Sequence, residues 1–321
     1  MARHTVIFDT DPGIDDAMAL LFLHLSPAVE LAGITTVLGN ATVETTTRNA
    51  LFLKERFGLS APVAKGAGAP LVGRAGDPPT FVHGHNGLGD IPLPETIGAL
   101  ADPRPAHRFI IDTVRAQPGA IDIVAVGRLT NLALALREDP EVVTLVRSVV
   151  IMGGAFGYHG HLGNITPAAE ANIHGDPLAA DEVFAAAWPI IAVGLDVTQE
   201  TIMSTEYLRS LGEEAGEIGR FIWDISRHYE DFYRSTGLEG ICVHDASAAA
   251  CLLAPELFEM RAGAIRVVQE GIALGQTIQK PDWRRFRPNI WDGRPSHQIC
   301  THVNSPALLA LYRDTILGHA N

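Results

Sequence analysis

Near its start the chain crowds four carboxylates into eight positions, directly after an apolar run. The run Val6–Phe8 has the character of a buried strand, and a Pro-Gly turn separates the aspartates, which are Asp9, Asp11, Asp15 and Asp16. Carboxylates at this density repel one another unless a cation or shared protons relieve them. A solvated acidic face is the alternative interpretation, but the carboxyl ends of buried strands are where α/β sheets build their sites. The pattern therefore predicts a metal site.

A further carboxylate candidate is Asp245, which follows His244 directly before a stretch of small residues, Ala246–Leu253. An aspartate at the start of a helix can serve simply as its N-cap. The adjacent histidine favours a second role, because a His–Asp pair ahead of a buried helix can join metal binding to proton transfer. We expect Asp245 to complete the N-terminal cluster.

One loop carries two amides and a carboxylate close together, without Lys or Arg: Asn164, Glu170 and Asn172. This set suits the recognition of neutral hydroxyl groups, although an ordinary surface loop gives the same composition. Two histidine pairs also have the spacing of metal ligands, His83/His85 and His159/His161. Neither pair has a nearby cysteine or third histidine to complete a tetrahedral site, so zinc is not expected.

Short apolar runs alternate with helical stretches such as Asp15–Leu25, and this alternation indicates a parallel sheet with helical crossovers. The runs are Thr5–Phe8, Leu31–Leu38, Pro62–Ala64, Ile121–Val126, Ser148–Met152 and Ile190–Leu195. Each of the longer runs ends in a polar or glycine-rich loop. The residues expected along this common edge are Asp11, Asn40, Gly127, Gly153 and Asp196. Such an edge is the expected ligand crevice.

The second half of the chain is less regular. It predicts an amphipathic helix over Glu214–Tyr233, a hairpin that pairs Ala264–Val268 with Ala273–Ile278, and a closing helix over Ser305–Leu317. Two long loops, Pro70–Pro94 and Gly153–Asn172, are typical of lids or binding loops. The fold class expected is α/β: an open, mostly parallel, Rossmann-like sheet flanked by helices, with helical and hairpin insertions in the C-terminal half. A single domain over residues 1–321 is the simplest organisation.

The composition argues against two classes of binding partner, nucleic acids and membranes. A net charge of −13 argues against nucleic acid, which needs clustered Lys and Arg. No apolar run approaches the roughly 18 residues of a membrane span, so no membrane partner is expected. The segment Met1–His4 leads directly into the first strand without room for a signal peptide, and the three cysteines form no metal-type pair. A cytoplasmic protein with reduced thiols is the expectation.

Six short motifs follow one another along most of the chain: Asp9–Asp16 (DTDPGIDD), Val37–Asn40 (VLGN), Gly127–Asn131 (GRLTN), Ile151–Ala155 (IMGGA), Asn164–Asn172 (NITPAAEAN) and Val243–Asp245 (VHD). In this order and at this spacing the chain resembles the nucleoside hydrolase family, the inosine–uridine nucleosidases. The resemblance implies a calcium ion held by three carboxylates and one backbone carbonyl, those of Asp11, Asp16, Asp245 and Val126. An all-oxygen site with several carboxylates independently suits Ca²⁺ better than octahedral Mg²⁺.

The resemblance also assigns the substrate contacts. The ribose 2′- and 3′-hydroxyls would lie on the ion and bond to Asp15, Asn40 and Asn172. The 5′-hydroxyl would meet Asn164 and Glu170, with Met152 beneath the sugar. The partner implied is a small ribonucleoside, bound by a homodimer or homotetramer in nucleoside salvage.

The expected reaction is hydrolysis of the N-glycosidic bond to free base and ribose. Cleavage builds oxocarbenium-like charge on the ribose, which a carboxylate-rich pocket stabilises. We expect a Ca-bound water, activated by Asp11 as general base, to attack with inversion. His244 is the candidate acid for the departing base. Tyr229 and Tyr233, one helical turn apart, would line the base pocket or relay a proton, unless they are core aromatics.

The expected preference for a nucleobase follows from the residues at two positions of the family's motifs. Purine-specific members of the family resemble one another in placing a Trp before the metal-binding aspartate, where this chain has His244. The segment His83–Leu88 matches the family's HGxxGL pattern, with Asn86 at a less familiar position, and makes His83 a contact to the base. An inosine–uridine or pyrimidine-preferring enzyme is therefore expected. Gln199 departs from a commoner His, without a consequence that the sequence reveals.

Two other readings compete. A haloacid-dehalogenase-like phosphatase would use Asp9 as nucleophile and Asp11 as acid, but Gly13 stands where its motif needs Thr or Val. Phosphatase catalysis of this type also requires a Lys and a phosphate-binding loop, and neither is evident near the sheet edge. A non-catalytic nucleoside- or sugar-binding protein on a similar scaffold is the second alternative. The carboxylate cluster speaks against it.

Overall fold

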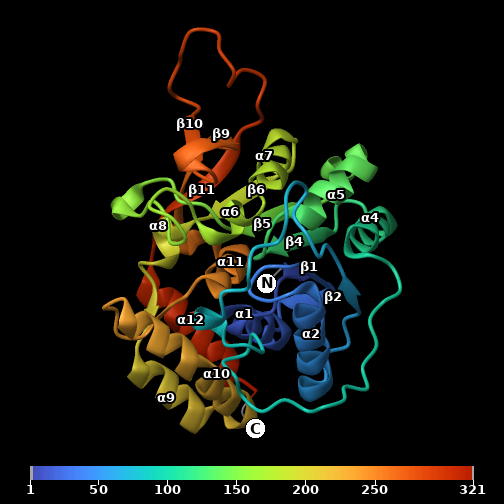
Figure 1. Ribbon diagram of the computed structural model, residues 1–321, viewed down its shortest axis with the longest axis vertical. Helices are drawn as coiled ribbons and strands as arrows, with labels where there is room; N and C mark the ends of the chain where they lie inside the picture. Colours follow the sequence, from blue (N-terminus) through green and yellow to red (C-terminus); the bar gives the residue numbers. More distant parts are fainter. Residues whose placement is uncertain (1–2, 320–321) are drawn as a thin grey trace.

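Nine strands form one sheet in the computed structural model, which describes residues 3–319 (Figure 1). Their order across the sheet is β10-β9-β11-β6-β5-β4-β1-β2-β3. The strands are β1 His4–Thr10, β2 Val29–Thr36, β3 Val63–Lys65, β4 Ile121–Ala125, β5 Ser148–Met152, β6 Ile190–Val193, β9 Phe258–Val267, β10 Thr277–Pro281 and β11 His297–Val303. The block from β3 to β11 is parallel, and β9 pairs antiparallel with both of its neighbours. The expected open, mostly parallel α/β fold is confirmed.

Helices cover both faces of the sheet, because successive side chains along strands such as β1 are buried on opposite faces. Val6 and Phe8 enter the larger core, to which α1, α2, α9, α10, α11 and α12 contribute, whereas Ile7 enters the core beneath α4, α5 and α7. A strand buried on both faces must be continuously apolar. The helices are α1 Ile14–Leu25, α2 Val43–Phe57, α3 Thr80–His83, α4 Ala106–Ala116, α5 Thr130–Glu138, α6 Ala171–Gly175, α7 Pro177–Ala185, α8 Leu195–Thr198, α9 Thr205–Glu214, α10 Gly216–Ser235, α11 Asp245–Leu253 and α12 Ser305–Leu317. Four short 3-10 turns and a two-stranded β7–β8 pair, Ile202–Met203 with Ile241–Cys242, complete the elements.

The carboxyl ends of β1, β2, β4, β5 and β6 lie along one edge of the sheet, because these strands are parallel and adjacent. Helix α11 packs against α1 and β5, which brings the N-terminus of α11 to this edge although more than 200 residues separate α11 from β1. The two loops that the sequence singles out also meet there. The edge therefore receives side chains from the first, middle and last thirds of the chain.

Two elements of the C-terminal half, α9 and β11, were not expected, and two expected elements have shifted bounds. The helix expected over Glu214–Tyr233 is α10, Gly216–Ser235, and the preceding helix α9 ends at Glu214. The expected hairpin exists, but its second strand begins at Thr277, after a 3-10 turn, rather than at Ala273. Strand β11 was not expected at all. The helix over Ser305–Leu317 is confirmed.

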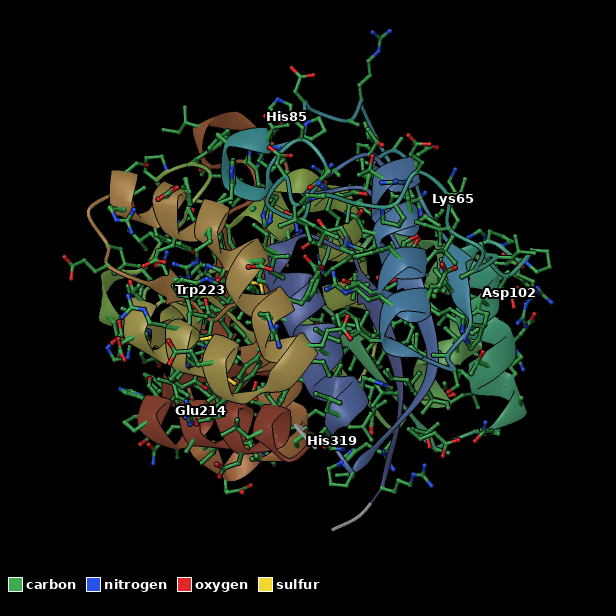
Figure 2. All side chains as sticks on the ribbon, turned by 90° about the horizontal axis from the view of Figure 1, so that it is seen from below. Lys65, His85, Asp102, Glu214, Trp223 and His319 are labelled. Atoms are coloured by element: carbon green, nitrogen blue, oxygen red, sulfur yellow. The ribbon has the colours of Figure 1, made fainter. Side chains whose placement is uncertain are left out.

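One further feature lies away from this edge. The chain between β10 and β11 forms a loop that projects from the body of the molecule (Figure 1). Figure 2 shows α9 and α10, marked by Glu214 and Trp223, on the opposite side of the molecule from Lys65 and Asp102. Within residues 3–319, no helix combines the length and hydropathy needed to cross a bilayer.

Candidate active site

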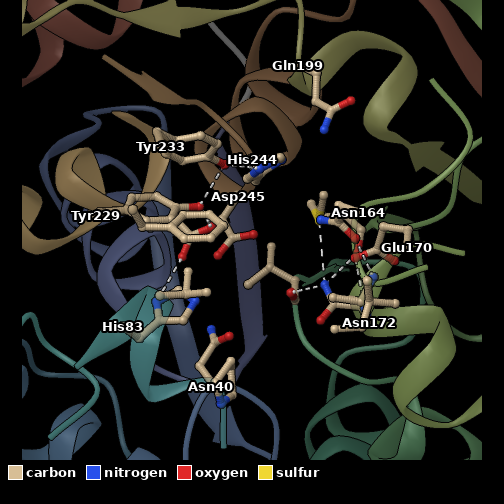
Figure 3. A pocket seen from close by; sticks show the side chains of 18 of the residues that line it. Asn40, His83, Asn164, Glu170, Asn172, Gln199, Tyr229, Tyr233, His244 and Asp245 are labelled. Atoms are coloured by element: carbon tan, nitrogen blue, oxygen red, sulfur yellow. Dashed lines mark hydrogen bonds and ion pairs between the residues drawn. The ribbon is translucent and has the colours of Figure 1, made fainter. Parts of the chain in front are cut away.

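A cavity of about 320 Å³ opens at the carboxyl edge of the sheet (Figure 3). Its lining contains every side chain that the sequence predicts to bind substrate: Asp15, Asn40, His83, Met152, Asn164, Glu170, Asn172, Tyr229, Tyr233 and Asp245, with Val126 and His244. The long loops and the strand ends thus build one site.

Three carboxylates meet beside this cavity, and two of them, Asp15 and Asp245, line it. Asp15 and Asp16 lie in the first turn of α1, and Asp245 is the first residue of α11; one carboxylate oxygen from each lies within 4.8 Å of the others. Asp245 does not cap its helix, since α11 has no side-chain cap hydrogen bond among the described residues. The prediction grouped Asp11, rather than Asp15, with the other two. In the structure Asp11 adjoins the group, because its backbone N–H donates to Asp16 Oδ1 (3.1 Å).

Asp16 is the most firmly held member of the cluster. Its Oδ1 accepts hydrogen bonds from Thr10 Oγ1 (2.5 Å) and from the Asp11 N–H, and its Oδ2 accepts from the Gly13 N–H (2.9 Å) and Asn40 Nδ2 (2.8 Å). The Gly13 contact is the return bond of a capping box, and a carboxylate at a helix N-terminus is also favoured by the helix dipole. The DPGxDD spacing therefore fixes Asp16 largely by local structure, and Asn40 adds one hydrogen bond from a more distant segment.

Asp11 is buried against backbone. Its Oδ2 accepts a hydrogen bond from the Asn40 N–H (2.7 Å), whereas its buried Oδ1 has no hydrogen-bond partner within residues 3–319. A Cβ on Gly39 would lie 1.8 Å from Oδ2, and one on Gly127 would lie 2.6 Å from Oδ1. These contacts explain the glycines in the VLGN and GRLTN motifs. A buried carboxylate oxygen without a partner is costly, which itself points to a cation.

The electrostatics of the cluster point the same way. Burial raises the pKa of Asp11 and of Asp245 well above the ordinary value, and nearby carboxylates raise both further. Burial raises the pKa of Asp15 to about 6, and burial and the charge of Asp15 raise the pKa of Asp16. A bound cation offsets the cost of burying several neighbouring carboxylate charges, and a site with only oxygen ligands suits a hard divalent ion. The residues present therefore fit a metal.

A second part of the cavity is built by the N-terminus of α6. The Glu170 carboxylate accepts hydrogen bonds from the backbone N–H groups of Asn172 (2.8 Å), Ile173 (3.1 Å) and Gly154 (2.9 Å). Burial raises the pKa of Glu170, while these donors oppose the rise. The position of Glu170 in the loop Gly153–Asn172 is thus set by capping, as is common for a carboxylate at a helix N-terminus.

The amides in this region are oriented by the groups to which they donate. Asn172 Nδ2 donates to the carbonyl oxygens of Val126 (2.7 Å) and Met152 (3.2 Å), and Asn40 Nδ2 donates to Asp16. Both residues therefore keep their side-chain carbonyl oxygens as acceptors. Asn164 is oriented the other way, since its Oδ1 accepts from the Ala171 N–H (3.0 Å). Together these groups offer both acceptors and donors, which is the chemistry that recognises hydroxyl groups.

The opposite wall carries a chain of hydrogen bonds (Figure 3). Tyr229 Oη donates to Asp15 Oδ2 (3.3 Å) and lies 3.3 Å from Tyr233 Oη. Tyr233 Oη lies 2.7 Å from His244 Nε2, and His244 Nδ1 lies 2.8 Å from Thr198 Oγ1. The sequence predicts the two tyrosines and the histidine. Thr198 was missed, because only the fold brings it to His244.

An ionised Asp15 sets the direction of this chain, since a carboxylate can only accept. Tyr229 then accepts from the Tyr233 hydroxyl, Tyr233 accepts from Nε2–H of His244, and Thr198 donates to Nδ1. Burial lowers the pKa of His244 to about 4, so the ring is neutral, as this arrangement requires. Burial also raises the pKa of both tyrosines well above the ordinary value, which keeps them protonated.

Aromatic rings surround this wall. His83 stacks on Tyr229 with centroids 5.5 Å apart, and the exposed Phe81 packs on Phe232 at 5.8 Å. Eight lining residues were not predicted: Pro79, Phe81, Val82, Ile165, Ala171, Gln199, Phe232 and Thr236. The helical periodicity of Glu214–Tyr233 contained Phe232, yet it assigned the ring to the core. The others lie in loops, in short helices or at helix ends, where no periodicity signals a side chain's direction.

Two residues expected near the site have other roles. Asp9 is fully buried, and its Oδ1 accepts from Thr35 Oγ1 (2.5 Å) and Asn131 Nδ2 (2.8 Å), so it ties β1 to its neighbours rather than facing the cavity. Asp196 accepts from the backbone N–H groups of Phe156 (2.9 Å) and Tyr158 (2.7 Å) and so holds the loop after β5. Asp9 in this position does not fit a nucleophile, which must reach its substrate.

The fold and the cavity together define an α/β protein whose polar groups suit a small hydroxylated ligand beside a carboxylate cluster. Residues 6–310 match the family described as inosine-uridine preferring nucleoside hydrolase. Uridine nucleosidase 1 of Arabidopsis thaliana is 41% identical over 307 residues, covering 95% of this chain and 90% of that protein. The inosine-uridine preferring nucleoside hydrolase of Crithidia fasciculata is 37% identical over 290 residues, covering 88% and 89%. The solved plant nucleoside hydrolase PpNRh1 superposes with a TM-score of 0.93 at 34% identity, covering 98% of this chain and 99% of that one.

The chain therefore belongs to the inosine-uridine preferring nucleoside hydrolase family, whose members hydrolyse the N-glycosidic bond of ribonucleosides. The expected family, fold class and enzyme class are confirmed.

Proposed function

We propose that the chain is a calcium-dependent hydrolase of the inosine–uridine or pyrimidine-preferring type, with uridine as a principal substrate. One observation carries the proposal: a single cavity joins a hydroxyl-binding, carboxylate-rich part to a His–Tyr wall. The first part suits ribose, and the second suits a departing base.

The cation would be held by Asp15, Asp16 and Asp245, with Asp11 and the carbonyl oxygen of Val126 as further ligands. Calcium is the best match, because it accepts many oxygen ligands in flexible geometry and leaves room for hydroxyl groups of a ligand. When bound, the ion lowers the pKa of water and polarises the ribose hydroxyls. The unpartnered buried oxygens of Asp11 and Asp15 support this set.

The protein's own groups carry the remaining steps. As the glycosidic bond breaks, positive charge develops on the ribose, and the carboxylates around the cavity stabilise it. Asp11 is the proposed general base, which removes a proton from the attacking water; its unpartnered Oδ1 can accept that proton. Direct attack by water inverts the anomeric carbon. Asn40, Asn172, Asn164 and Glu170 orient the sugar, with Met152 beneath it.

The departing base needs a proton or a donor for its developing charge. His244 is the proposed acid, acting directly or through Tyr233, since its Nε2–H is directed to that hydroxyl. A neutral imidazole donates a hydrogen bond without the desolvation penalty of a buried cation. The proton that His244 gives to the departing base is replaced by the proton that the attacking water gives to Asp11, so that one water is consumed for each glycosidic bond broken. His83, stacked on Tyr229, is the proposed contact to the base.

The substrate preference rests on two observations. The residue before Asp245 is His244, and the described cavity lining includes no Trp. The Arabidopsis relative is named a uridine nucleosidase and the Crithidia relative an inosine-uridine preferring hydrolase. A cavity without tryptophan stacking favours recognition by hydrogen bonds, which suits uracil and hypoxanthine.

We further propose a homodimer or homotetramer in the reducing cytoplasm. The loop between β10 and β11 exposes Trp283 and Ile290 beside three arginines, Arg284, Arg285 and Arg287. In a chain of net charge −13, this cationic loop complements the acidic body of a second copy. Multi-angle light scattering tests this: a monomer at micromolar concentration, as the only species, would contradict it.

The proposed activity is tested with purified protein and Ca²⁺ in a reducing-sugar assay. The substrates are inosine, adenosine, guanosine, uridine and cytidine, with p-nitrophenyl phosphate for the phosphatase alternative. Ribose release led by uridine or inosine is expected. Preference for adenosine and guanosine would overturn the subclass, and phosphate release without ribose release would overturn the calcium-hydrolase mechanism.

A further inference from the structure

Gln199 lines the cavity but has no role in the reaction as described above. Figure 3 shows its carboxamide apart from the other labelled side chains, with no interaction drawn to them. A carboxamide has two donors and an acceptor in fixed geometry. A half-buried amide that faces a cavity without a partner is placed to meet a ligand.

The backbone around Gln199 is firmly fixed. Gln199 caps α8, and its N–H donates to Leu195 O (3.2 Å). The preceding residue, Thr198, is fully buried and hydrogen-bonds to His244. The same turn therefore positions both the group that orients the candidate acid and the amide that follows it. A ligand group that contacts His244 would therefore also lie near the carboxamide of Gln199.

The hydrogen-bonding capacity of this wall is otherwise largely used. Both ring nitrogens of His244 have partners, and the two tyrosine hydroxyls bond to each other and to Asp15 and His244. Thr236 Oγ1 donates to Tyr233 O (2.8 Å). Apart from His83, whose Nδ1 accepts a hydrogen bond from the Ile14 N–H (3.3 Å) and which therefore has one free ring nitrogen within residues 3–319, the remaining lining there is aromatic or apolar. Gln199 is thus the group best able to add both a donor and an acceptor for a base.

The sugar does not need this amide, because Glu170 and Asn164 already serve the 5′-end and Asn40 and Asn172 serve the ring hydroxyls. Uracil and hypoxanthine each present an N–H beside a carbonyl oxygen. A carboxamide pairs with that edge through two hydrogen bonds.

We infer that Gln199 is a specificity-determining residue that hydrogen-bonds the N–H/C=O edge of the nucleobase. This inference rests on the proposed function, since it assumes that ribose occupies the carboxylate-rich part. It names the recognised substrates as nucleosides with a lactam edge, such as uridine and inosine. The hydrogen bonds help to hold the base where His244 can act.

The test compares uridine with p-nitrophenyl riboside, which has the same sugar and no lactam edge. Gln199→Met keeps the length of the side chain and removes both polar groups. We expect the ratio of kcat/KM for uridine to that for the riboside to fall about 10- to 50-fold. Gln199→Glu, which cannot donate, should lower the ratio as well. Gln117→Met, an exposed change before β4 at the opposite edge of the sheet, is the matched control.

Two outcomes would overturn the inference while leaving the proposed function intact. One is a ratio within twofold of wild type in folded Gln199→Met. The other is a loss seen with uridine but not with 5′-deoxyuridine, which would place the amide at the 5′-hydroxyl. Wild-type protein that hydrolyses neither uridine nor the riboside would instead refute the proposed function, and the inference would fall with it.

Discussion

Replacing Thr198 with valine removes one hydroxyl from the hydrogen-bonded chain that ends at Asp15. Thr198 is fully buried, and its Oγ1 lies 2.8 Å from His244 Nδ1. Valine has nearly the same shape, so the change deletes the hydrogen bond without opening a cavity. His244 then keeps its position by packing and by its bond to Tyr233 (2.7 Å) alone.

The size of the effect follows from the burial of the pair. A lost neutral hydrogen bond costs about 1 kcal/mol, and an unsatisfied buried nitrogen raises this to about 1–2 kcal/mol. If that free energy appears in the transition state, kcat for uridine falls about 5- to 30-fold. Nitrophenolate leaves without a proton, so p-nitrophenyl riboside should lose less than about threefold by the same scale.

Steady-state kinetics with both substrates measure this difference. Thr201→Val is the control, because Thr201 is also buried and its hydroxyl bonds to Ser305 Oγ (3.0 Å), away from the cavity. Equal losses on both substrates in Thr198→Val would refute the reasoning, because they would mean that Thr198 supports the fold rather than leaving-group chemistry.

Three other predictions concern the carboxylates. Gly39→Ala should lower Ca²⁺ affinity in calorimetry more than about tenfold, because its Cβ would lie 1.8 Å from Asp11 Oδ2; unchanged affinity would remove Asp11 from the ligand set. Asp11→Ala should lower kcat for uridine about 10²–10⁴-fold with thermal unfolding preserved, and near-normal turnover would exclude it as the base. Arg147→Met should lower the free energy of unfolding at pH 7 by about 1–2 kcal/mol, because Arg147 pairs with the buried Asp122 but is itself partly exposed. Burial alone would raise the pKa of Asp122, but Arg147 and other donors outweigh it and hold the pKa below the ordinary value. The contribution is therefore present above the ordinary pKa and lost as pH falls through the lower folded one, so urea titrations should show the deficit shrinking below about pH 4 and a constant deficit would contradict the pairing.

Local sequence signals account for much of the site. The DPGxDD spacing sets α1 and its capping box, and therefore places Asp15 and Asp16 in the first turn of that helix. The loop ending in Asn172 carries its own helix cap, Glu170, so its polar set is also local. Asp245 could be expected in the cluster because α11 is apolar enough to pack against α1.

The missed features depend on contacts between distant segments. Thr198 acquires its role from a residue 46 positions away, and no spacing rule links the two. Strand β11, with the sequence HQICTHV, mixes polar and apolar residues and becomes a strand by pairing with both β6 and β9. Helix α9, Thr205–Glu214, was not predicted, and Gly216, with φ of 59°, separates it from α10. Asp15 lies beside Asp16 and Asp245 in the structure, a proximity that the spacing of the motif alone does not show.

The most direct test of the central claim is ribose release from uridine before and after removal of the cation. Protein dialysed against EDTA should lose activity and regain it with Ca²⁺. A bound cation favours the ionised form of the buried carboxylates, and the ionised carboxylates stabilise the positive charge that develops on the ribose in the transition state. Full activity after chelation, or recovery with Zn²⁺ alone, would contradict the assignment of the carboxylate cluster as a calcium site.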